Sequence, residues 1–464
     1  MLLHRFRSLV ALWLGKLAIW LSRVAGRGGS SLPGRVARLV YPGILTALAG
    51  QTGRGNVVIT GTNGKTTTAN MVAGILKAAG WRYTHNRTGA NLMNGLTSAF
   101  LESASPGGRV RSEVGLLEVD EATMPRAVAE VRPRVAVVTN FFRDQLDRYG
   151  ELEHTVELAR VALQRLGPHG AAVLNADDPL VASLGPDLPF RAIYYGIEDT
   201  GAGLGEAFQA ADAKFCISCG RPYIYEVYYC AHLGKYHCPY CGRRRPDPQV
   251  YVHRLGAAGM EGTWLEISTP AGPLEFLLPV PGMYNVYNAL AAIGCAVALG
   301  LDLQRVREGL ASYSSAFGRM EAVEVNGRRL LLALVKNPAG FNEVLRTVLR
   351  EKGPKYLMLA INDRYADGTD ISWLWDVDFE LLGQGAEAPV FCVASGLRGE
   401  DMRLRLKYAG LDPSRLLLET NLREALSRSL ERVPPGETLY VLPTYTAMLE
   451  LREILHKLGY TRKF

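Results

Sequence analysis

Short apolar runs alternate with amphipathic stretches along most of the chain. Residues 57–60 form a continuous apolar run typical of a buried strand, and residues 65–79, after a glycine-rich turn, have helical periodicity. Further strand-like runs follow at residues 114–119, 135–139 and 171–174. Strands that alternate with helices predict a parallel sheet covered by helices, that is, an α/β domain.

The same alternation resumes in the last third of the chain. Strand-like runs lie at 330–335, 356–361, 390–394 and 438–442, and helical stretches lie around 343–351, 422–432 and 447–458. This pattern predicts a second, Rossmann-like α/β domain. Between the two sets, a patch rich in Cys, Tyr and Arg resembles an insertion, and strands then lead to a helix near Asn285. We therefore expect an N-terminal basic helical segment (1–50), a central domain (51–318) with an insertion at 212–247, and a C-terminal domain (319–464).

Length and composition agree with a folded protein of several domains. The chain has 464 residues, of which 48% are hydrophobic and 21% are charged. These values exclude collagenous, disordered and polytopic membrane chains. Seven cysteines, four of them in two close pairs, favour a reducing compartment and a metal site over a secreted disulfide framework. We therefore predict a cytoplasmic protein.

Charge is distributed unevenly. Residues 1–101 contain twelve Lys and Arg and no acidic residue, whereas the whole chain carries +7. The basic segment faces phosphates, an acidic membrane or nucleic acid, or it is neutralised by the acidic remainder of the chain. Residues 9–20 are largely apolar behind Arg5 and Arg7, but Gly15 and Lys16 interrupt them, so we expect neither a signal peptide nor a membrane span. A helix at the membrane interface and a helix packed on the next domain both remain open.

The glycine-rich turn reads Gly61-Thr62-Asn63-Gly64-Lys65-Thr66-Thr67-Thr68. Such a turn binds phosphate because N–H groups at a helix N-terminus, a lysine and a Mg²⁺-binding hydroxyl converge on one anion. The full eight-position pattern would need glycine at position 59, where this chain has Ile59. The candidate nucleotide-binding residues are Thr62, Asn63, Gly64, Lys65, Thr66 and Thr67, with Thr66 on Mg²⁺.

Carboxylates follow two of the predicted strands. Glu118 ends one strand, and Asp144 and Asp147 lie in the loop after another. Ligands of an open α/β sheet bind beyond the carboxyl ends of the strands, so these groups are candidates to hold Mg²⁺ beside the phosphates. For Glu118 we favour the magnesium role over helix capping. For the two aspartates, pairing with neighbouring arginines is an equal alternative.

Four cysteines have the spacing of a zinc ribbon. Two Cys-x₂-Cys pairs are separated by eighteen residues, and the expected ligands are Cys216, Cys219, Cys238 and Cys241. Cys230, His232 and His237 are less favoured substitutes. A closed four-sulfur site has no open position for substrate, so we expect a structural zinc. The tyrosines and arginines nearby either bind nucleic acid or stiffen a hairpin, and we favour the hairpin.

Together these motifs resemble the Mur ligase superfamily, whose members activate a carboxylate with ATP and capture the acyl phosphate with an amine. The resemblance is carried by GTNGKTTT at Gly61, TNFFRDQLDRYG at Thr139, LNADDP at Leu174, PGMYNVYNALAA at Pro281 and FGRME at Phe317. It implies an α/β, Mur ligase-like fold: a central P-loop parallel-sheet domain with an inserted zinc ribbon, then a C-terminal Rossmann-like domain.

Within the superfamily the chain resembles the MurT family, ligase-like subunits that act with a glutaminase of the GatD type on lipid II. The cysteine ribbon, KNPAGFN at Lys336 and NDRYADGTD at Asn362, leading to SWLWD at Ser372, carry this resemblance. Where amino-acid-adding Mur ligases have an aspartate- and histidine-containing motif, this chain has Val335-Lys336-Asn337-Pro338. That departure puts an amino-acid-receiving site in doubt and suits an enzyme that uses ammonia.

The resemblance implies an activity, cofactors and partners. It implies ATP-dependent amidation of the D-glutamate α-carboxylate of lipid II to D-isoglutamine, with ATP, Mg²⁺ and Zn²⁺. Asn288 and Arg319 would contact the nucleotide, and Glu118 and Asp370 would be catalytic. Asp370 would orient the histidine of a separate Cys–His glutaminase across the interface; Asp367 and Asp376 are its alternatives, and capping the helix near Ser372 is the other interpretation.

Cys295 and Cys392 lie in apolar segments and are expected in the core, so the ammonia source is a separate subunit resembling GatD. The substrate would be membrane-anchored, with peripheral contact at the inner face of the plasma membrane and no nucleic-acid partner. A rival is a stand-alone Mur or folylpolyglutamate-synthase-like amino-acid ligase. A rival of another class is a zinc-ribbon nucleic-acid-binding NTPase, which would leave the Pro281 motif unexplained.

Overall fold

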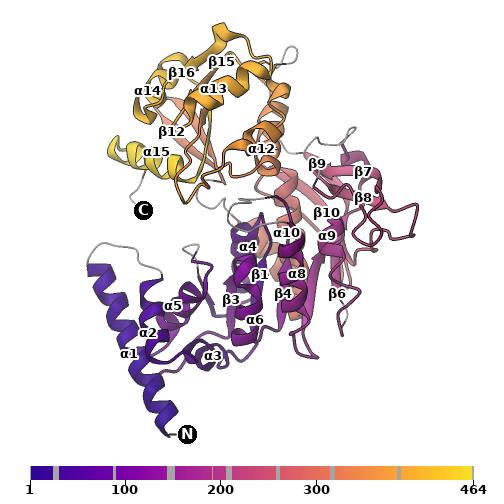
Figure 1. The fold of residues 1–464 in the computed structure, drawn as a ribbon, viewed down its shortest axis with the longest axis vertical. Helices are drawn as coiled ribbons and strands as arrows, with labels where there is room; N and C mark the ends of the chain where they lie inside the picture. The colour runs from indigo at the N-terminus through magenta and orange to yellow at the C-terminus, as the bar shows by residue number, and fades with distance from the viewer. Residues whose placement is uncertain are drawn as a thin grey trace.

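The computed structural model describes residues 2–24, 31–86, 90–143, 152–190, 192–204, 212–257, 262–313, 319–383 and 388–461. Figure 1 shows three layers of structure along the long axis: N-terminal helices, a central sheet with helices on both faces, and a C-terminal α/β unit. The expected boundaries at residues 50 and 318 stay predictions.

The central unit is built on one sheet, formed by nine strands of the described ranges. In spatial order they are β11 (Gly272–Leu278), β10 (Thr263–Thr269), β9 (Val250–Ala257), β6 (Ala192–Ile197), β5 (Ala171–Asn175), β4 (Val135–Val138), β1 (Asn56–Thr60), β3 (Val114–Glu118) and β2 (Tyr83–His85). Neighbours from β2 to β9 pair in parallel, and β10 and β11 add an antiparallel edge. The sheet is thus mainly parallel, as the sequence predicted, with an antiparallel edge at β10 and β11.

Helices cover both faces of this sheet, which explains the continuous apolar run of β1. Val57 and Ile59 face the layer of α4 (Lys65–Ala78), α10 (Met283–Leu299) and α11 (Leu303–Ala311), and Val58 faces the opposite layer. The opposite layer contains α3 (Ile44–Ala49), α5 (Met93–Ser103), α6 (Met124–Val131), α8 (Leu152–Leu163) and the short α9 (Pro179–Ala182). Because side chains alternate between faces and both faces are buried, every position of the strand is apolar or neutral.

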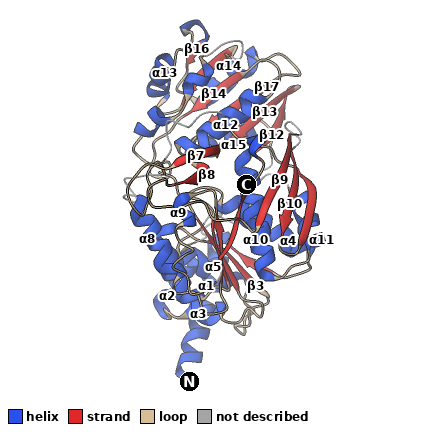
Figure 2. Cartoon of the chain, turned by 90° about the vertical axis from the view of Figure 1, so that its right-hand side faces the viewer, coloured by secondary structure: helices blue, strands red, loops and turns tan. Residues whose placement is uncertain are grey.

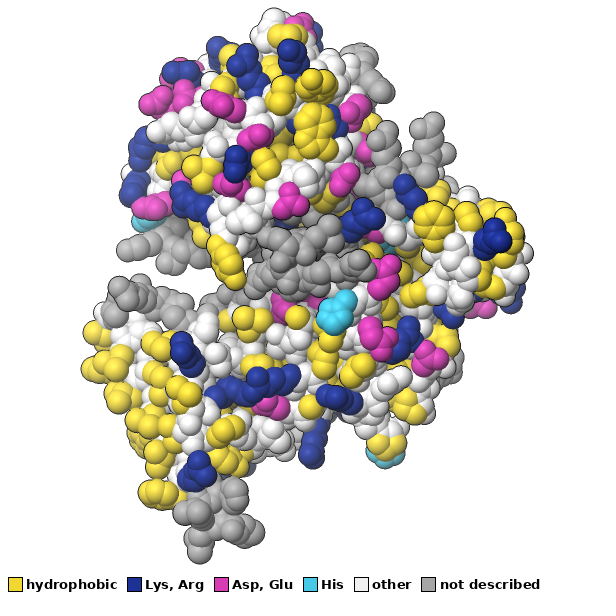
Figure 3. Space-filling view, viewed as in Figure 1, with side chains coloured by type: hydrophobic (Ala, Val, Ile, Leu, Met, Phe, Trp, Pro, Cys, Tyr) yellow, Lys and Arg dark blue, Asp and Glu magenta, His cyan; other side chains and the backbone are white. Residues whose placement is uncertain are grey.

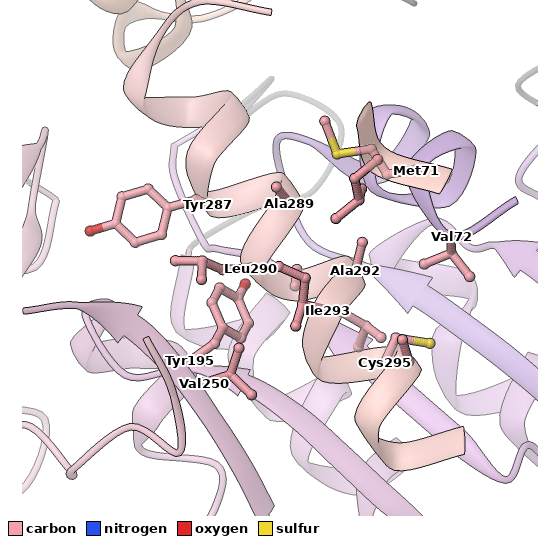
Figure 4. Close-up of a cluster of buried hydrophobic side chains, with 14 of the residues drawn as sticks. Met71, Val72, Tyr195, Val250, Tyr287, Ala289, Leu290, Ala292, Ile293 and Cys295 are labelled. Carbon is pink, nitrogen blue, oxygen red and sulfur yellow. The ribbon is translucent and has the colours of Figure 1, made fainter. Parts of the chain in front are cut away.

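Helix α10 lies at the centre of one layer. Its alanines and Ile293 pack against α4 and strands β6 and β9, and Cys295 is fully buried among them (Figure 4). Cys392 is also fully buried, in the C-terminal unit. Both cysteines are core residues, as the sequence predicted.

The C-terminal unit has a six-stranded sheet in the described residues. The order is β12 (Arg319–Val325), β13 (Arg328–Ala333), β17 (Thr438–Pro443), β14 (Tyr356–Ala360), β15 (Phe391–Ser395) and β16 (Leu416–Leu418), parallel except for the β12–β13 hairpin. Helices α12 (Pro338–Arg350) and α13 (Gly399–Tyr408) cover one face, and α14 (Leu422–Arg432) and α15 (Tyr445–Lys457) cover the other (Figure 2). This is the Rossmann-like unit that the sequence predicted.

At the N-terminal end, α1 (Leu2–Val24) lies beside α2 (Leu32–Val40), and α2 packs on α5 (Figure 1). Helix α1 runs through Gly15 and Lys16, the two residues that interrupt its apolar sequence. A Cβ at Gly15 would lie 2.7 Å from Leu101 Cδ1, so this glycine permits close packing on α5. No helix in the described part of the chain is long and apolar enough to span a membrane.

Candidate active site

A cavity of about 480 Å³ lies where the central and C-terminal units meet. Its lining includes the glycine-rich loop, Glu118, Asn288 of α10, Cys230 and the start of α12. In an open α/β sheet the carboxyl ends of the strands are the usual place for a ligand, and β1 and β3 both end here. This cavity is therefore the candidate active site.

The loop conformation requires its two glycines. Gly61 and Gly64 have φ of +121° and +85°, and a Cβ at Gly64 would lie 2.1 Å from Asn288 Oδ1. Backbone groups of the loop are held by the segment after β4: Asn63 N donates to Asn140 Oδ1 at 2.9 Å, and Asn63 O accepts from Thr139 Oγ1 at 2.7 Å. The TNFF segment after β4 thus holds the loop in place, a role that the sequence analysis did not assign to Asn140.

The other loop side chains have distinct surroundings. The Thr62 hydroxyl bonds the backbone of Phe142 rather than the cavity. Thr67 is buried, and its Oγ1 has no hydrogen-bond partner in the described residues. Lys65 Nζ contacts Gly61 O, Thr62 O and, at 2.8 Å, Glu121 Oε1. The loop lysine therefore carries a buried counter-ion, and Glu121 is a site residue that the sequence analysis passed over in favour of Glu118.

Thr66 and Glu118 meet as the magnesium prediction requires. Thr66 Oγ1 donates to Glu118 Oε2 at 2.9 Å, and Glu118 is only 4% exposed. A hydroxyl beside a buried carboxylate is a donor set that Mg²⁺ uses next to phosphates. The following 3₁₀-helix η1 (Glu121–Thr123) is capped by Asp120, whose Oδ1 accepts from Ala122 N at 3.2 Å. Asp144 and Asp147, the other two magnesium candidates, lie outside the described residues.

Asn288 reaches the loop from α10. Its Oδ1 accepts from Thr68 Oγ1 at 3.3 Å, while its buried Nδ2 has no partner among the described residues. An unpaired buried donor beside a phosphate-type loop suits a polar ligand. Arg319 begins β12 next to Ala333, another cavity residue, but its side chain lies outside the described part.

The C-terminal unit contacts the loop through a reciprocal amide pair. Asn337 Nδ2 donates to Asn63 Oδ1 at 3.0 Å, and Asn63 Nδ2 donates back to Asn337 Oδ1 at 3.4 Å. Asn337 also caps α12 by accepting from Gly340 N. Farther along α12, Glu343 lines the same cavity, and burial raises the pKa of its carboxyl to about 6 although the Cys230 thiol bonds it.

Asp370 lies on the surface, apart from the cavity lining. Its carboxylate accepts from Ser372 N at 2.8 Å and Ser372 Oγ at 3.0 Å, at the start of the 3₁₀-helix η4 (Ser372–Asp376). The N-cap position of η4 is Ile371, without a side-chain capping bond, and the Asp370 carboxylate remains exposed beside Ser372. Asp367 is buried and bonded to Thr446, whereas Asp376 is exposed.

The four cysteines of the insertion converge. Their Sγ atoms all lie within 4.8 Å of one another, with 3.6 Å between Cys216 and Cys241 and 3.5 Å between Cys219 and Cys238. Tetrahedral Zn–S bonds of about 2.3 Å would separate sulfurs by about 3.8 Å, so the set fits zinc. Each pair sits in the same kind of turn, closed by Gly220 or Gly242 with positive φ.

The alternative ligands lie elsewhere. Cys230 faces Glu343, His232 packs on Phe142, and His237 Nδ1 lies 3.3 Å from Glu226. The strands between the cysteine pairs, β7 (Ile224–Cys230) and β8 (Leu233–His237), form a hairpin whose tyrosines stack on one another. These ring contacts lie within the hairpin, and the stiffening role favoured from the sequence stays a prediction.

A buried ionic network joins this insertion to the central unit. Asp177 is fully buried and accepts from Arg245 Nε, from Tyr287 OH at 2.7 Å and from Ile197 N at 2.9 Å. Arg245 Nη1 also donates to Glu198 Oε1 at 2.6 Å. Burial raises the pKa of Asp177, and Arg245 opposes that effect. Because the Arg245 guanidinium is bonded to two carboxylates within the protein, it is not free to contact a nucleic acid.

Comparison with known proteins gives two family matches. Residues 59–221 match the Mur ligase middle domain, and residues 334–448 match the MurT ligase C-terminal domain. The subunit MurT of lipid II isoglutaminyl synthase (glutamine-hydrolyzing) from Staphylococcus aureus (strain COL) is 35% identical over 97% of this chain and 98% of its own length. The corresponding subunit of Streptococcus pneumoniae (strain ATCC BAA-255 / R6) is 34% identical over 96% of this chain and 95% of its own.

Solved structures share the fold. A pseudomurein peptide ligase type C from Methanothermus fervidus superposes with a TM-score of 0.69, at 24% identity, over 89% of this chain and 80% of that chain. A folylpolyglutamate synthase from Mycobacterium tuberculosis gives 0.60 at 17% identity, over 90% of this chain and 95% of that one. At these identities the likeness concerns the fold alone.

Proposed function

The chain belongs to the MurT family of Mur ligases, and from this membership we propose that it is the ATP-dependent ligase subunit of a lipid II isoglutaminyl synthase. It amidates the α-carboxylate of D-glutamate in the lipid II stem peptide, giving D-isoglutamine. The observation that carries the proposal is identity to curated MurT subunits over nearly the whole length of both chains.

The reaction has to activate an inert acid. Ammonia does not displace oxide from a carboxylate, so the γ-phosphoryl group of ATP is first transferred to a carboxylate oxygen, releasing ADP. The nitrogen of NH₃ then attacks the acyl carbon, the C–O bond to phosphate breaks, inorganic phosphate leaves and the nitrogen loses a proton. Positioning and charge stabilisation are the protein's main contributions to such a phosphoryl transfer.

Lys65 and the backbone N–H groups of residues 64–67 hold the phosphates in this proposal, since the N–H groups of Thr62 and Asn63 are bonded to Asn140. Lys65 Nζ exchanges Glu121 for the β- and γ-phosphate oxygens, and the buried Nδ2 of Asn288 donates to the nucleotide. Arg319 contacts the nucleotide from the start of β12. Thr66 and Glu118 would hold Mg²⁺, which neutralises charge on the phosphates when bound.

Ammonia comes from a separate glutaminase subunit of the GatD type. Ammonia is mostly protonated at neutral pH and is then no nucleophile, so a partner that delivers NH₃ serves the reaction. Cys295 and Cys392 are fully buried and unsuited to glutamine hydrolysis, and burial raises the pKa of the Cys295 thiol to about 12. The exposed carboxylate of Asp370 orients the catalytic histidine of that partner.

The test of Asp370 uses two nitrogen sources. In the complex with the glutaminase, Asp370→Asn should lose most amidation with glutamine and keep it with ammonium. The matched control is Asp376→Asn, an exposed carboxylate six residues away, which should keep both. Equal activity of Asp370→Asn and the control with glutamine would contradict the role; equal loss with both nitrogen sources would place Asp370 in the ligase step.

The four cysteines bind a structural zinc ion in this proposal, and the substrate is a lipid that restricts the enzyme to the inner face of the plasma membrane. The decisive experiment supplies the chain and its glutaminase with ATP, glutamine and lipid II in detergent, and follows conversion of carboxylate to amide by mass spectrometry. Lys65→Ala should abolish product. If the chain alone joins a free amino acid to the acceptor, the proposal is refuted.

A further inference from the structure

Helix α1 has two apolar faces that differ in their packing. One face is buried against α2 and α5, through Ala11, Leu12, Gly15 and Ala18. The other is exposed, although its side chains are large. Its members, which we name the apolar stripe, are 39–68% exposed: Phe6, Leu9, Trp13, Leu14, Leu17, Trp20, Leu21 and Val24. Figure 3 shows hydrophobic side chains gathered over the N-terminal helices, at the lower left of the molecule.

The stripe is continuous. At about 100° per residue its members fall within one sector of about 140° around the helix axis, and the other residues of α1 in that sector are Leu2, Leu3 and Val10, all apolar. Helix α2, which packs beside α1, also exposes Leu32 and Leu39, at 52% and 77%. A contiguous apolar surface of this size marks an interaction site on a folded protein.

Cations border the stripe on both sides. With the same 100° per residue, Arg7 lies at one edge of the sector, and Lys16 and Arg23 lie at the other edge. Arg7 is exposed and its Nη2 donates to Val40 O at 3.4 Å, and the part-buried Lys16 Nζ donates to Leu101 O at 2.9 Å. The single ion pair along this rim is that of Arg23 with Glu102, 3.4 Å apart and largely exposed, in the described part of the chain. Residues 1–101 hold twelve basic residues and no acidic one. Arg38, Arg54, Lys65 and Arg82 pair with glutamates that follow in the chain, so the basic character beside the stripe comes from its own rim cations.

An apolar sector with tryptophans and a basic rim complements an anionic lipid surface. The stripe enters the boundary between headgroups and acyl chains, the indoles sit at the interface, and the cations meet lipid phosphates. A second copy packed through the same stripe would bring two basic rims together, which electrostatics disfavours. Charge therefore selects the membrane over self-association.

We propose that α1 docks the protein in the plane of an anionic bilayer through the apolar stripe and its basic rim. The inference deepens the proposed function and rests on it for its purpose, because a lipid-linked acceptor is presented at that surface. The docking geometry itself rests on α1 alone.

The test is sedimentation of the full-length chain with lipid vesicles, without nucleotide or acceptor. The chain should bind vesicles of phosphatidylcholine with phosphatidylglycerol, and bind pure phosphatidylcholine roughly tenfold more weakly. Trp13→Ser with Leu17→Ser should reduce binding to anionic vesicles roughly tenfold or more. The matched control is Trp264→Ser with Leu277→Ser, which removes an exposed Trp and Leu from another surface and should bind normally.

Two further measurements separate the alternatives. Emission from Trp13 and Trp20 should shift to the blue on vesicle addition, and replacing both by Phe should remove that shift without loss of binding. Binding unchanged in the Trp13/Leu17 variant would overturn the proposal. So would a stripe-dependent dimer, or stripe-dependent association with the glutaminase, without vesicle binding. Amidation in detergent is read separately, so failed docking with normal amidation refutes this inference and leaves the proposed function standing.

Discussion

The ion pair of Arg245 and Asp177 allows a sharp prediction about how the cysteine insertion is attached. Arg245→Met leaves Asp177, which is fully buried, with Tyr287 and Ile197 N but no cation. Removing one partner of a buried pair costs about 3–5 kcal/mol. We expect the free energy of unfolding at pH 7 to fall by about that amount, a large part of the 5–15 kcal/mol typical of a folded domain.

Two further variants isolate the buried charge. Asp177→Asn with Arg245→Met removes both charges and should lose less than about 2 kcal/mol relative to the native chain, because no uncompensated carboxylate remains. Lys235→Met removes a partly exposed cation from the same network, where it pairs with Glu198, and should cost less than about 1 kcal/mol.

The sign of the pH dependence follows from the pKa of Asp177, which burial already raises above 3.8. Without Arg245 that pKa rises further, so the folded variant favours the protonated acid. The loss of unfolding free energy in Arg245→Met, relative to the native chain, should therefore become smaller as pH falls below neutrality and larger as pH rises. Urea unfolding at pH 5 and pH 7, followed by circular dichroism, measures both effects. The reasoning is refuted if Arg245→Met loses no more stability than Lys235→Met. It is also refuted if the Asp177→Asn/Arg245→Met double variant loses as much stability as Asp177→Asn and Arg245→Met lose together when each is made alone.

Three other predictions concern the cavity and the ribbon. Gly64→Ala forces a positive φ and a steric clash, so ATP affinity in calorimetry should fall at least about tenfold, while Gly53→Ala, in open space, should not change it. Burial raises the pKa of Glu343 from 4.5 to about 6, so the free energy of unfolding should fall by about 2 kcal/mol as pH rises through this interval. Glu343→Gln should abolish that fall in urea titrations, and an unchanged dependence of the unfolding free energy on pH would contradict the prediction. Cys219→Ser should remove one equivalent of zinc by elemental analysis, whereas Cys295→Ala, a core change, should retain the metal.

The sequence predicts best what local pattern determines. The strand, turn and helix around Gly61 follow from a buried run, positive-φ glycines and helical periodicity, and they occur where expected. The cysteine spacing likewise brings four sulfurs together because each pair sits in its own short turn. Such features need few contacts from distant parts of the chain.

Long-range partners are harder to predict. Nothing local distinguishes Asn140 or Asn337 from other loop amides, and their roles arise only when β4 and α12 arrive beside the glycine-rich loop. Glu118 and Glu121 are three residues apart. Because β3 ends at Glu118, Glu118 contacts Thr66 and Glu121 contacts Lys65. The close packing of Gly15 against Leu101 is likewise a long-range contact that nothing in the sequence around Gly15 indicates.

The ion pair of Lys65 with Glu121 also bears on how an anion enters. An arriving phosphate meets a lysine whose charge is already balanced from within, so entry is an exchange of counter-ions rather than the neutralisation of a bare cation. The released carboxylate must then turn toward water or another cation. Association at this loop should accordingly vary less with ionic strength than its lysine alone suggests, and selectivity should favour anions that also satisfy the surrounding N–H groups.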